Sequence, residues 1–154
     1  MNLIENLKKN NIIIKTNAKS RWEIIEEMVD LAAKNKDIPI EDAESIKKSL
    51  IEREKSMSTG IGNGIAIPHC STAKVSNIVA VMALVQKGLN FEAIDNEPAK
   101  IVILLVVPKD KLSQHIKTLA NIAKMMSNAK LREKLLELKT ADSILKTLKQ
   151  YSSE

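Results

Sequence analysis

Hydrophobic residues recur at helical spacing in several stretches of this chain. Between residues 24 and 32, apolar side chains return every three or four positions, as they do along one face of a helix. Ser20 and Glu23 precede this run as a capping box. In such a box the serine side chain accepts an N–H of the first helical turn, and the glutamate side chain accepts the N–H of the serine. The pattern predicts helices over residues 20–34, 40–54, 112–126, 128–138 and 140–151. Asn128 and Thr140 are the expected N-caps of the last two.

Continuous apolar runs predict the strands. Residues 78–85 and 101–107 are apolar throughout, as in strands that are covered on both faces. Shorter strands are expected at residues 12–14 and 64–67, the second ending at Pro68.

The connections between these elements predict the fold class. Turns are indicated at Lys87-Gly88 and Asp95-Asn96, and the segment between residues 85 and 101 is too short for a full crossover helix. The sheet should therefore be mixed rather than all-parallel. We expect an α/β fold of the α+β sandwich type, with one three-layer domain over residues 1–154 in which helices flank a mixed β-sheet.

Composition and charge narrow the classes of partner. The net charge of +5 raises the question of nucleic acid, but the chain has only three aromatic residues, Trp22, Phe91 and Tyr151, and no zinc-finger spacing. Lysine-rich helix faces exposed to solvent explain the charge, and such a face could also attract an acidic protein. We expect no nucleic-acid partner.

The segments that would indicate export or a membrane are missing from the sequence as given. No apolar run approaches the length of a membrane span, and the first residues lack the apolar core of a signal peptide. The single cysteine, Cys70, suits a reducing compartment. We expect a cytoplasmic protein with no direct membrane insertion.

Glycine is concentrated in one segment. Three of the four glycines, Gly60, Gly62 and Gly64, precede one of the two histidines, His69. Backbone this free can approach an anion closely. The segment is neither a P-loop, since no Gly-Lys-Ser/Thr ends it, nor a dinucleotide fingerprint, because a strand-like stretch follows it instead of a helix.

The residues around this segment suggest phosphoryl chemistry. His69 is the candidate nucleophile, because neutral imidazole is abundant at neutral pH and is a good nitrogen nucleophile. Arg53 is the candidate cation for the phosphoryl oxygens. Backbone amides of a candidate phosphate-binding loop are the neutral donors; the loop consists of Thr59, Gly60, Ile61, Gly62, Asn63 and Gly64.

Other interpretations stay open at this point. His115, near the start of a predicted helix, is either a surface histidine or a partner that assists His69. A metal site with two histidines lacks a convincing acidic ligand, so we expect neither metal nor cofactor. Cys70 could in principle carry phosphate, but a small packing role suits it better.

Together these residues resemble a known family. Arg53-Glu54 followed by residues 59–69 is similar to the active-site signature of EIIA components of the bacterial phosphoenolpyruvate:sugar phosphotransferase system, of the fructose, mannitol and nitrogen type. Residues 91–96, the strand ending at Pro108 and His115 also fall where that family has matching features, so the resemblance covers essentially the whole chain.

The resemblance implies a phosphocarrier. The histidine at the position of His69 would take a phosphoryl group from HPr or an HPr-like carrier and pass it to an EIIB component for sugar uptake, with Arg53 and His115 as further active-site residues. The alternative is a nitrogen-type regulatory protein, in which the phosphorylation state of His69 controls binding to partner proteins. A phosphate-binding domain without transfer is a third interpretation. The residues after His69, beginning with Cys70, depart from the small residues that many relatives have there.

Overall fold

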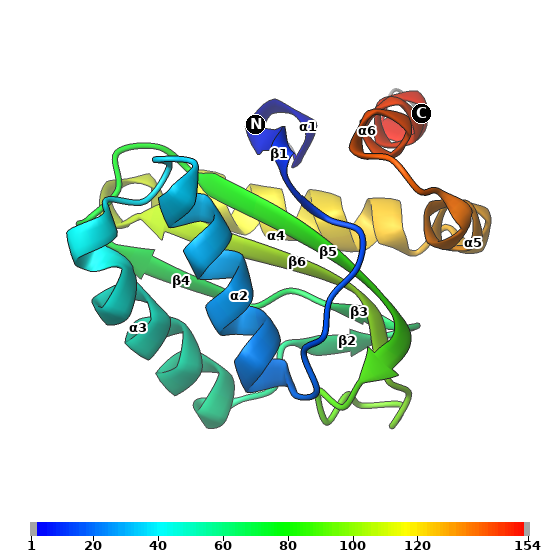
Figure 1. Cartoon of the computed structure of the whole chain (residues 1–154), viewed down its shortest axis with the longest axis horizontal. Coiled ribbons are helices and arrows are strands. Elements are labelled where there is room, and N and C mark those ends of the chain that lie inside the picture. Colours follow the sequence, from blue (N-terminus) through cyan, green and yellow to red (C-terminus); the bar gives the residue numbers. More distant parts are fainter. Residues whose placement is uncertain (1–2, 153–154) are drawn as a thin grey trace.

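The computed structural model describes residues 3–152, whose strands form one mixed sheet (Figure 1). Along the sheet the order is β1-β5-β6-β3-β2, and β4 also pairs with β6. The strands are β1 (Leu7–Ile13), β2 (Gly60–Gly62), β3 (Ile65–Ala66), β4 (His69–Thr72), β5 (Val79–Leu89) and β6 (Ala99–Pro108). The pairs β1–β5, β3–β6 and β4–β6 are parallel, whereas β5–β6 and β2–β3 are antiparallel. The prediction of a mixed sheet is confirmed.

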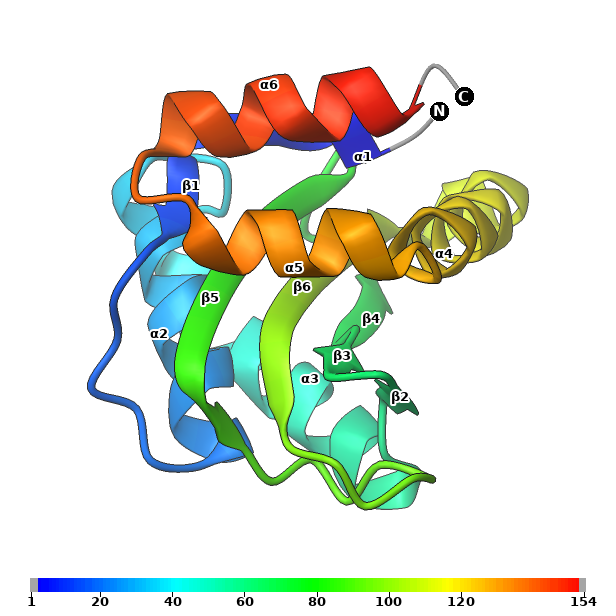
Figure 2. The same ribbon diagram turned by 90° about the vertical axis from the view of Figure 1, so that its right-hand side faces the viewer.

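Helices cover both faces of this sheet. They are α1 (Leu3–Asn6), α2 (Arg21–Lys34), α3 (Ala43–Ser56), α4 (Leu112–Met126), α5 (Ala129–Glu137) and α6 (Ala141–Ser152), with short 3-10 turns η1 (Ile40–Asp42) and η2 (Lys109–Lys111). α2 and α3 pack on one face, and α1, α4, α5 and α6 pack on the other (Figures 1 and 2). The layers are therefore those expected of a sheet flanked by helices.

The central strand β6 shows why the two apolar runs are strands. Val102, Leu104 and Val106 belong to the core beneath α2 and α3. Ile103 and Leu105 alternate with them and belong to the core on the opposite face. A strand that is buried on both faces has no position for a polar side chain, so the sequence shows a continuous apolar run.

Three of the predicted helix starts are confirmed by their N-caps. Ser20 accepts the amide N–H of Glu23 at 3.1 Å, as predicted, but the Glu23 carboxylate accepts the Ser20 hydroxyl at 3.4 Å and not the Ser20 N–H that the capping box predicted. Asn128 accepts the amide of Lys130 at 3.0 Å. Thr140 accepts the amide of Ser143 at 3.1 Å. These side chains satisfy backbone donors that the first turn of each helix leaves free.

The strands β1 and β5 differ most from the prediction. β1 spans Leu7–Ile13, whereas the sequence pattern indicated residues 12–14. It lies at the end of the sheet order, and its residues Lys8 to Asn10 are exposed and polar, which hides the strand from a search for apolar runs. β5 continues through the predicted turn at Gly88, which adopts φ +76° where the pairing with β6 shifts register.

The glycine segment is more regular than expected. β2 and β3 form a hairpin whose connecting residues Asn63 and Gly64 have φ values of 57° and 78°. An Asn-Gly pair with both residues at positive φ is the preferred two-residue hairpin turn. A further strand, β4, begins at His69, where the sequence had predicted that a strand ends at Pro68. The hairpin and β4 therefore bring the glycine segment and His69 to the edge of β6.

Candidate functional site

His69 is held by backbone pairing with β6. Its strand β4 runs parallel to β6, with His69 opposite Leu105. Just before it, the carbonyl of Pro68 accepts the amide of Leu105 at 2.9 Å. Pro68 has no N–H to donate and separates β3 from β4 on the same edge of β6. The imidazole therefore projects from a strand whose backbone is fixed.

The His69 ring has one defined hydrogen bond. Its Nδ1 lies 2.8 Å from the carbonyl oxygen of Ile67. A carbonyl only accepts, so in the neutral ring Nδ1 carries the proton and Nε2 carries the lone pair. Burial lowers the pKa of His69, and the charge of Arg53 adds to this, while the Ile67 carbonyl and Glu54 oppose it. The residue is thus neutral near pH 7, with Nε2 as the nucleophilic atom.

His115 lies against His69 from a different element. It is on the first turns of α4, and the two ring centroids are 5.3 Å apart at an interplanar angle of 49°. The side chain is buried, and within residues 3–152 its Nδ1 has no hydrogen-bond partner. Burial, followed by the neighbouring His69, lowers the pKa of His115. A buried polar atom without a partner is costly, so the position of this ring calls for a reason beyond packing.

Arg53 reaches the same place from the last turn of α3. Its guanidinium donates to the carbonyl of Met57 at 2.8 Å. Arg53, His69 and His115 line one pocket of about 480 Å³, together with Ser49, Glu52, Cys70 and Ser71. The structure therefore brings together the three side chains that the sequence singled out from residues 53, 69 and 115.

The predicted phosphate-binding loop is placed differently. The amide of Thr59 donates to Glu54 at 3.0 Å, that of Gly60 to the Ser58 hydroxyl at 3.0 Å, and that of Asn63 to the Asp95 carboxylate at 2.9 Å. These amides are therefore used inside the protein. The residues predicted to bind phosphate, Thr59, Gly60, Ile61, Gly62, Asn63 and Gly64, are not among those that line the pocket with His69.

The glycines of this loop serve close packing and turning. A Cβ on Gly60 would lie 2.9 Å from the Cβ of Ala93, and Gly62 has φ +90° beside the Asp95 carboxylate. The two hydrogen bonds from the amides of Asn63 and Glu97 lower the pKa of Asp95. The loop is thus anchored to the segment around Asp95, and its glycines are needed for that contact.

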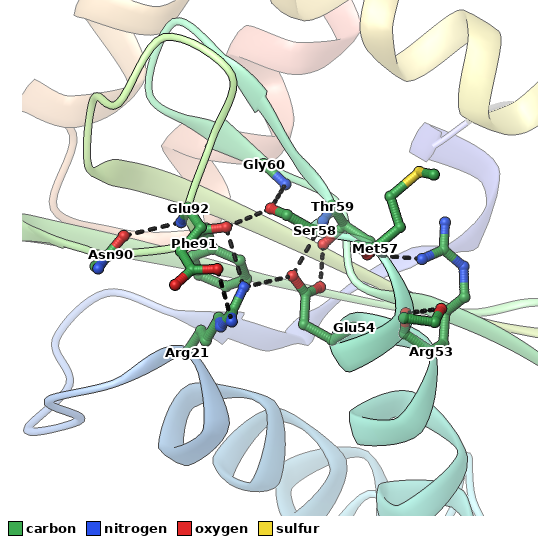
Figure 3. Close-up of polar contacts among 11 residues, drawn as sticks. Arg21, Arg53, Glu54, Met57, Ser58, Thr59, Gly60, Asn90, Phe91 and Glu92 are labelled. Carbon is green, nitrogen blue, oxygen red and sulfur yellow. Dashed lines mark hydrogen bonds and ion pairs between the residues drawn. The ribbon is translucent and has the colours of Figure 1, made fainter.

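Glu54 was singled out in the sequence only as part of the Arg53-Glu54 signature, and its burial and its contacts were not predicted. It is 1% exposed, and its carboxylate accepts from the amide and the hydroxyl of Thr59 and pairs with Arg21 at 3.3 Å (Figure 3). Arg21 also donates to the carbonyl of Phe91 at 3.1 Å and lies 4.3 Å from the Trp22 ring. The burial of Glu54 was indicated in the sequence only by its spacing, because a residue four positions after Leu50 lies on the same buried face of α3.

Cys70 follows His69 on β4 but belongs to the core beneath α2 and α3. Burial raises the pKa of its thiol to about 12. A thiol with that pKa stays protonated at neutral pH and is a poor nucleophile. The environment favours the packing role over a phosphocysteine.

Among the described residues, no group of three or more His, Cys, Asp or Glu side chains is placed to hold a metal ion. Over the same residues, none of the helices combines the length and the apolar character needed to cross a bilayer.

Comparison with known proteins identifies relatives over nearly the whole chain. A family model described as "Phosphoenolpyruvate-dependent sugar phosphotransferase system, EIIA 2" matches residues 5–151. A fructose-specific EIIABC component of this transport system from Bacillus subtilis is 30% identical over 151 residues, which are 98% of this chain and 24% of that protein. The chain thus spans about a quarter of that relative. A nitrogen regulatory protein from Pseudomonas aeruginosa is 33% identical over 81% of this chain and 80% of that protein.

Solved structures show the same architecture. Nitrogen regulatory protein IIA-Ntr from Neisseria meningitidis superposes with a TM-score of 0.85 at 27% identity, covering 95% of this chain and 98% of that one. IIA mannitol from Escherichia coli gives a TM-score of 0.79 at 21% identity, over 93% of this chain and 99% of that one. The second likeness concerns the fold alone.

Proposed function

Since the chain belongs to the EIIA 2 family of the phosphoenolpyruvate-dependent sugar phosphotransferase system, we propose that it is a phosphocarrier that works through a transient phosphohistidine at His69. His69 receives the phosphoryl group from HPr or an HPr-like carrier and passes it to an EIIB component for sugar uptake. The observation that carries the assignment to His69 is its Nδ1 hydrogen bond to the Ile67 carbonyl at 2.8 Å, which leaves the Nε2 lone pair as the nucleophile.

The transfer itself requires alignment and charge compensation. The Nε2 lone pair of His69 attacks phosphorus while the bond from phosphorus to the donor imidazole breaks, and the donor nitrogen keeps that electron pair. Arg53, on the wall of the same pocket, compensates the charge on the equatorial oxygens. His115 donates an N–H to a phosphoryl oxygen, since a buried imidazole 5.3 Å from His69 can reach a group attached to it.

The experiment that tests this function is intact-mass measurement after incubation with phosphoenolpyruvate, Enzyme I and HPr. Wild type should gain one acid-labile phosphoryl group, and His69→Ala should gain none because no other residue replaces the Nε2 nucleophile. Cys70→Ala serves as the matched control from the next position of β4 and should be phosphorylated like wild type. An adduct on His69→Ala would contradict the assignment.

A second candidate function is regulatory. The nitrogen regulatory protein of Pseudomonas aeruginosa is 33% identical over 81% of this chain, which supports a role in which phosphorylation of His69 selects a regulatory protein partner. The two candidate functions are distinguished by measuring phosphoryl transfer from the phosphorylated protein to an EIIB component. Rapid transfer supports sugar uptake, whereas a stable phosphoprotein with altered partner binding supports regulation.

The wider setting follows from the same proposal. Residues 1–154 act as a single domain. The protein works in the cytoplasm, where it contacts the HPr-type carrier and the EIIB component. It binds neither nucleic acid nor a cofactor. The experiment for the domain assignment is limited proteolysis, which should leave a fragment close to full length.

A further inference from the structure

The region behind the candidate site contains a carboxylate that the transfer step does not use. Glu54 directly follows Arg53 on α3 and is 1% exposed. Burying a carboxylate is costly unless its oxygens accept hydrogen bonds, and here one oxygen accepts the amide of Thr59 at 3.0 Å while the other accepts the Thr59 hydroxyl (Figure 3). Arg21 supplies the opposite charge at 3.3 Å. Such an arrangement holds Thr59 firmly against the end of α3.

Thr59 is in turn connected to the nucleophile. Its carbonyl accepts the amide of Ile67 at 3.0 Å. The carbonyl of Ile67 is the group that binds Nδ1 of His69 at 2.8 Å. A continuous series of hydrogen bonds therefore runs from the Glu54 carboxylate through Thr59 and Ile67 to the imidazole.

The same carboxylate also fixes the surroundings of Arg53. Residues 54–59 consist of the end of α3 and the loop that follows it, and these hydrogen bonds close them into one loop that contains Met57. The Met57 carbonyl accepts the guanidinium of Arg53 at 2.8 Å (Figure 3). The contact that holds the cation and the contact that holds the nucleophile thus both depend on the loop from residue 54 to residue 59.

We propose that Glu54 is a positioning residue, which fixes His69 as its Nδ1–H tautomer and holds Arg53 at the pocket by pinning this loop. The effect on transfer rests on the proposed function, whereas the effect on the tautomer does not. Groups that orient a reactive imidazole through its other nitrogen typically change activity by about 10- to 100-fold when they are removed.

The chain provides a matched control at the other end of the same helix pair. Asp30 of α2 pairs with Lys47 of α3 at 2.8 Å, so it too is a carboxylate in an ion pair between these helices. It has no hydrogen bond to the loop from residue 54 to residue 59. Asp30→Ala should therefore change the contact between α2 and α3 without reaching the site.

Two substitutions of Glu54 separate geometry from charge. Glu54→Ala removes every acceptor, so Thr59 loses its anchor. Glu54→Gln keeps the geometry, because the amide oxygen can accept from the Thr59 amide while the amide nitrogen donates to the Thr59 hydroxyl oxygen. The glutamine variant should therefore restore what the alanine variant loses.

The test measures the His69 tautomer by 15N-edited NMR of the ring nitrogens and the phosphoryl transfer rate on the same samples. The chain has only two histidines, so a His115→Asn sample assigns the signals. In wild type and Asp30→Ala, the Nδ1–H tautomer of His69 should predominate. In Glu54→Ala, the two tautomers should mix and transfer from phospho-HPr should slow by about 10- to 100-fold, with Glu54→Gln close to wild type.

The proposal is overturned if Glu54→Ala folds and matches Asp30→Ala in both tautomer and rate, or if Glu54→Gln loses as much as Glu54→Ala. If Glu54→Ala does not fold by circular dichroism, Glu54→Asp decides instead, because the shorter side chain cannot keep both hydrogen bonds to Thr59; an unchanged tautomer ratio in that folded variant would refute the positioning role. If wild type accepts no phosphoryl group, the proposed function fails, but the tautomer measurement still decides the role of Glu54.

Discussion

The two histidines lie in contrasting environments although their rings are 5.3 Å apart. His69 is half-buried on a strand, and its Nδ1 binds a backbone carbonyl at 2.8 Å. His115 is 8% exposed on a helix, and its Nδ1 lacks any partner in the part of the chain that the structure describes. Burial lowers the pKa of both rings, so both are neutral at pH 7. Nε2 of His69 therefore keeps its lone pair, whereas His115 holds a buried polar atom that has no partner among the described residues.

The positive charge of Arg53 affects the pKa values of the two rings differently. The positive charge of Arg53 contributes to lowering the pKa of His69, whereas the charge effect on His115 comes from His69. The positive charge of Arg53 thus acts on His69 rather than on His115, and we predict that the nucleophile and the cation act as one unit while His115 contributes separately. The variants below are ordered by the size of effect that this view predicts.

Removing the cation should have the largest effect on the rate while the nucleophile is kept. Arg53→Ala should slow transfer by about 100- to 1000-fold, as loss of one preorganised charge donor does in other active sites. Without the positive charge, the pKa of His69 should rise. Single-turnover transfer and NMR titration of the two rings measure both effects.

The control for this variant is Lys48→Ala, which removes an exposed positive charge from the same helix. It should leave the transfer rate and both titrations as in wild type. A rate in Arg53→Ala equal to that of Lys48→Ala would remove the arginine from the mechanism.

His115→Ala should have a smaller effect, because this ring assists but does not form the bond. Transfer should slow by about 10- to 100-fold, with the phosphoryl group still on His69. His115→Asn keeps a donor N–H near the same place and should recover part of the rate. If loss of the His115 ring abolished phosphorylation entirely while the protein stayed folded, the division of roles between the two histidines would be wrong.

The sequence allows a site residue to be predicted when its residue type and its position are both unusual. Arg53, His69 and His115 are rare or conspicuous residue types in informative places, and the structure brings all three to one pocket. Their roles stay predictions. The amides of the glycine segment were expected at the phosphate, but glycine shows only that a backbone is free, and it does not show what that backbone contacts.

The hidden features share a physical cause. Glu54 lies in a helix rich in lysine and glutamate, where most charged residues face solvent, so its burial shows only through spacing. β1 is an edge strand with exposed lysines. Its pairing with β5 depends on backbone hydrogen bonds, which almost any residue type can make and which therefore leave no pattern in the sequence. The apolar strands β5 and β6 and the capped helices were predictable, because burial on both faces and N-caps restrict which residues are allowed.

The smallest expected effect is on the free energy of unfolding at low pH. It can be measured without any phosphoryl donor. Because burial lowers the pKa of both histidines in the folded state, the unfolded chain binds more protons as the pH falls below the ordinary value of 6.5. Their contribution to the free energy of unfolding is therefore complete above pH 6.5 and is lost as the pH falls through the lowered pKa values. Each unit of difference in pKa corresponds to about 1.4 kcal/mol. Urea unfolding at pH 7.5 and pH 5.5 should show a smaller loss in His115→Asn than in wild type, because the asparagine does not titrate. An equal loss in the two proteins would mean that His115 takes up its proton as easily in the folded chain as in the unfolded one, so that burial does not lower its pKa.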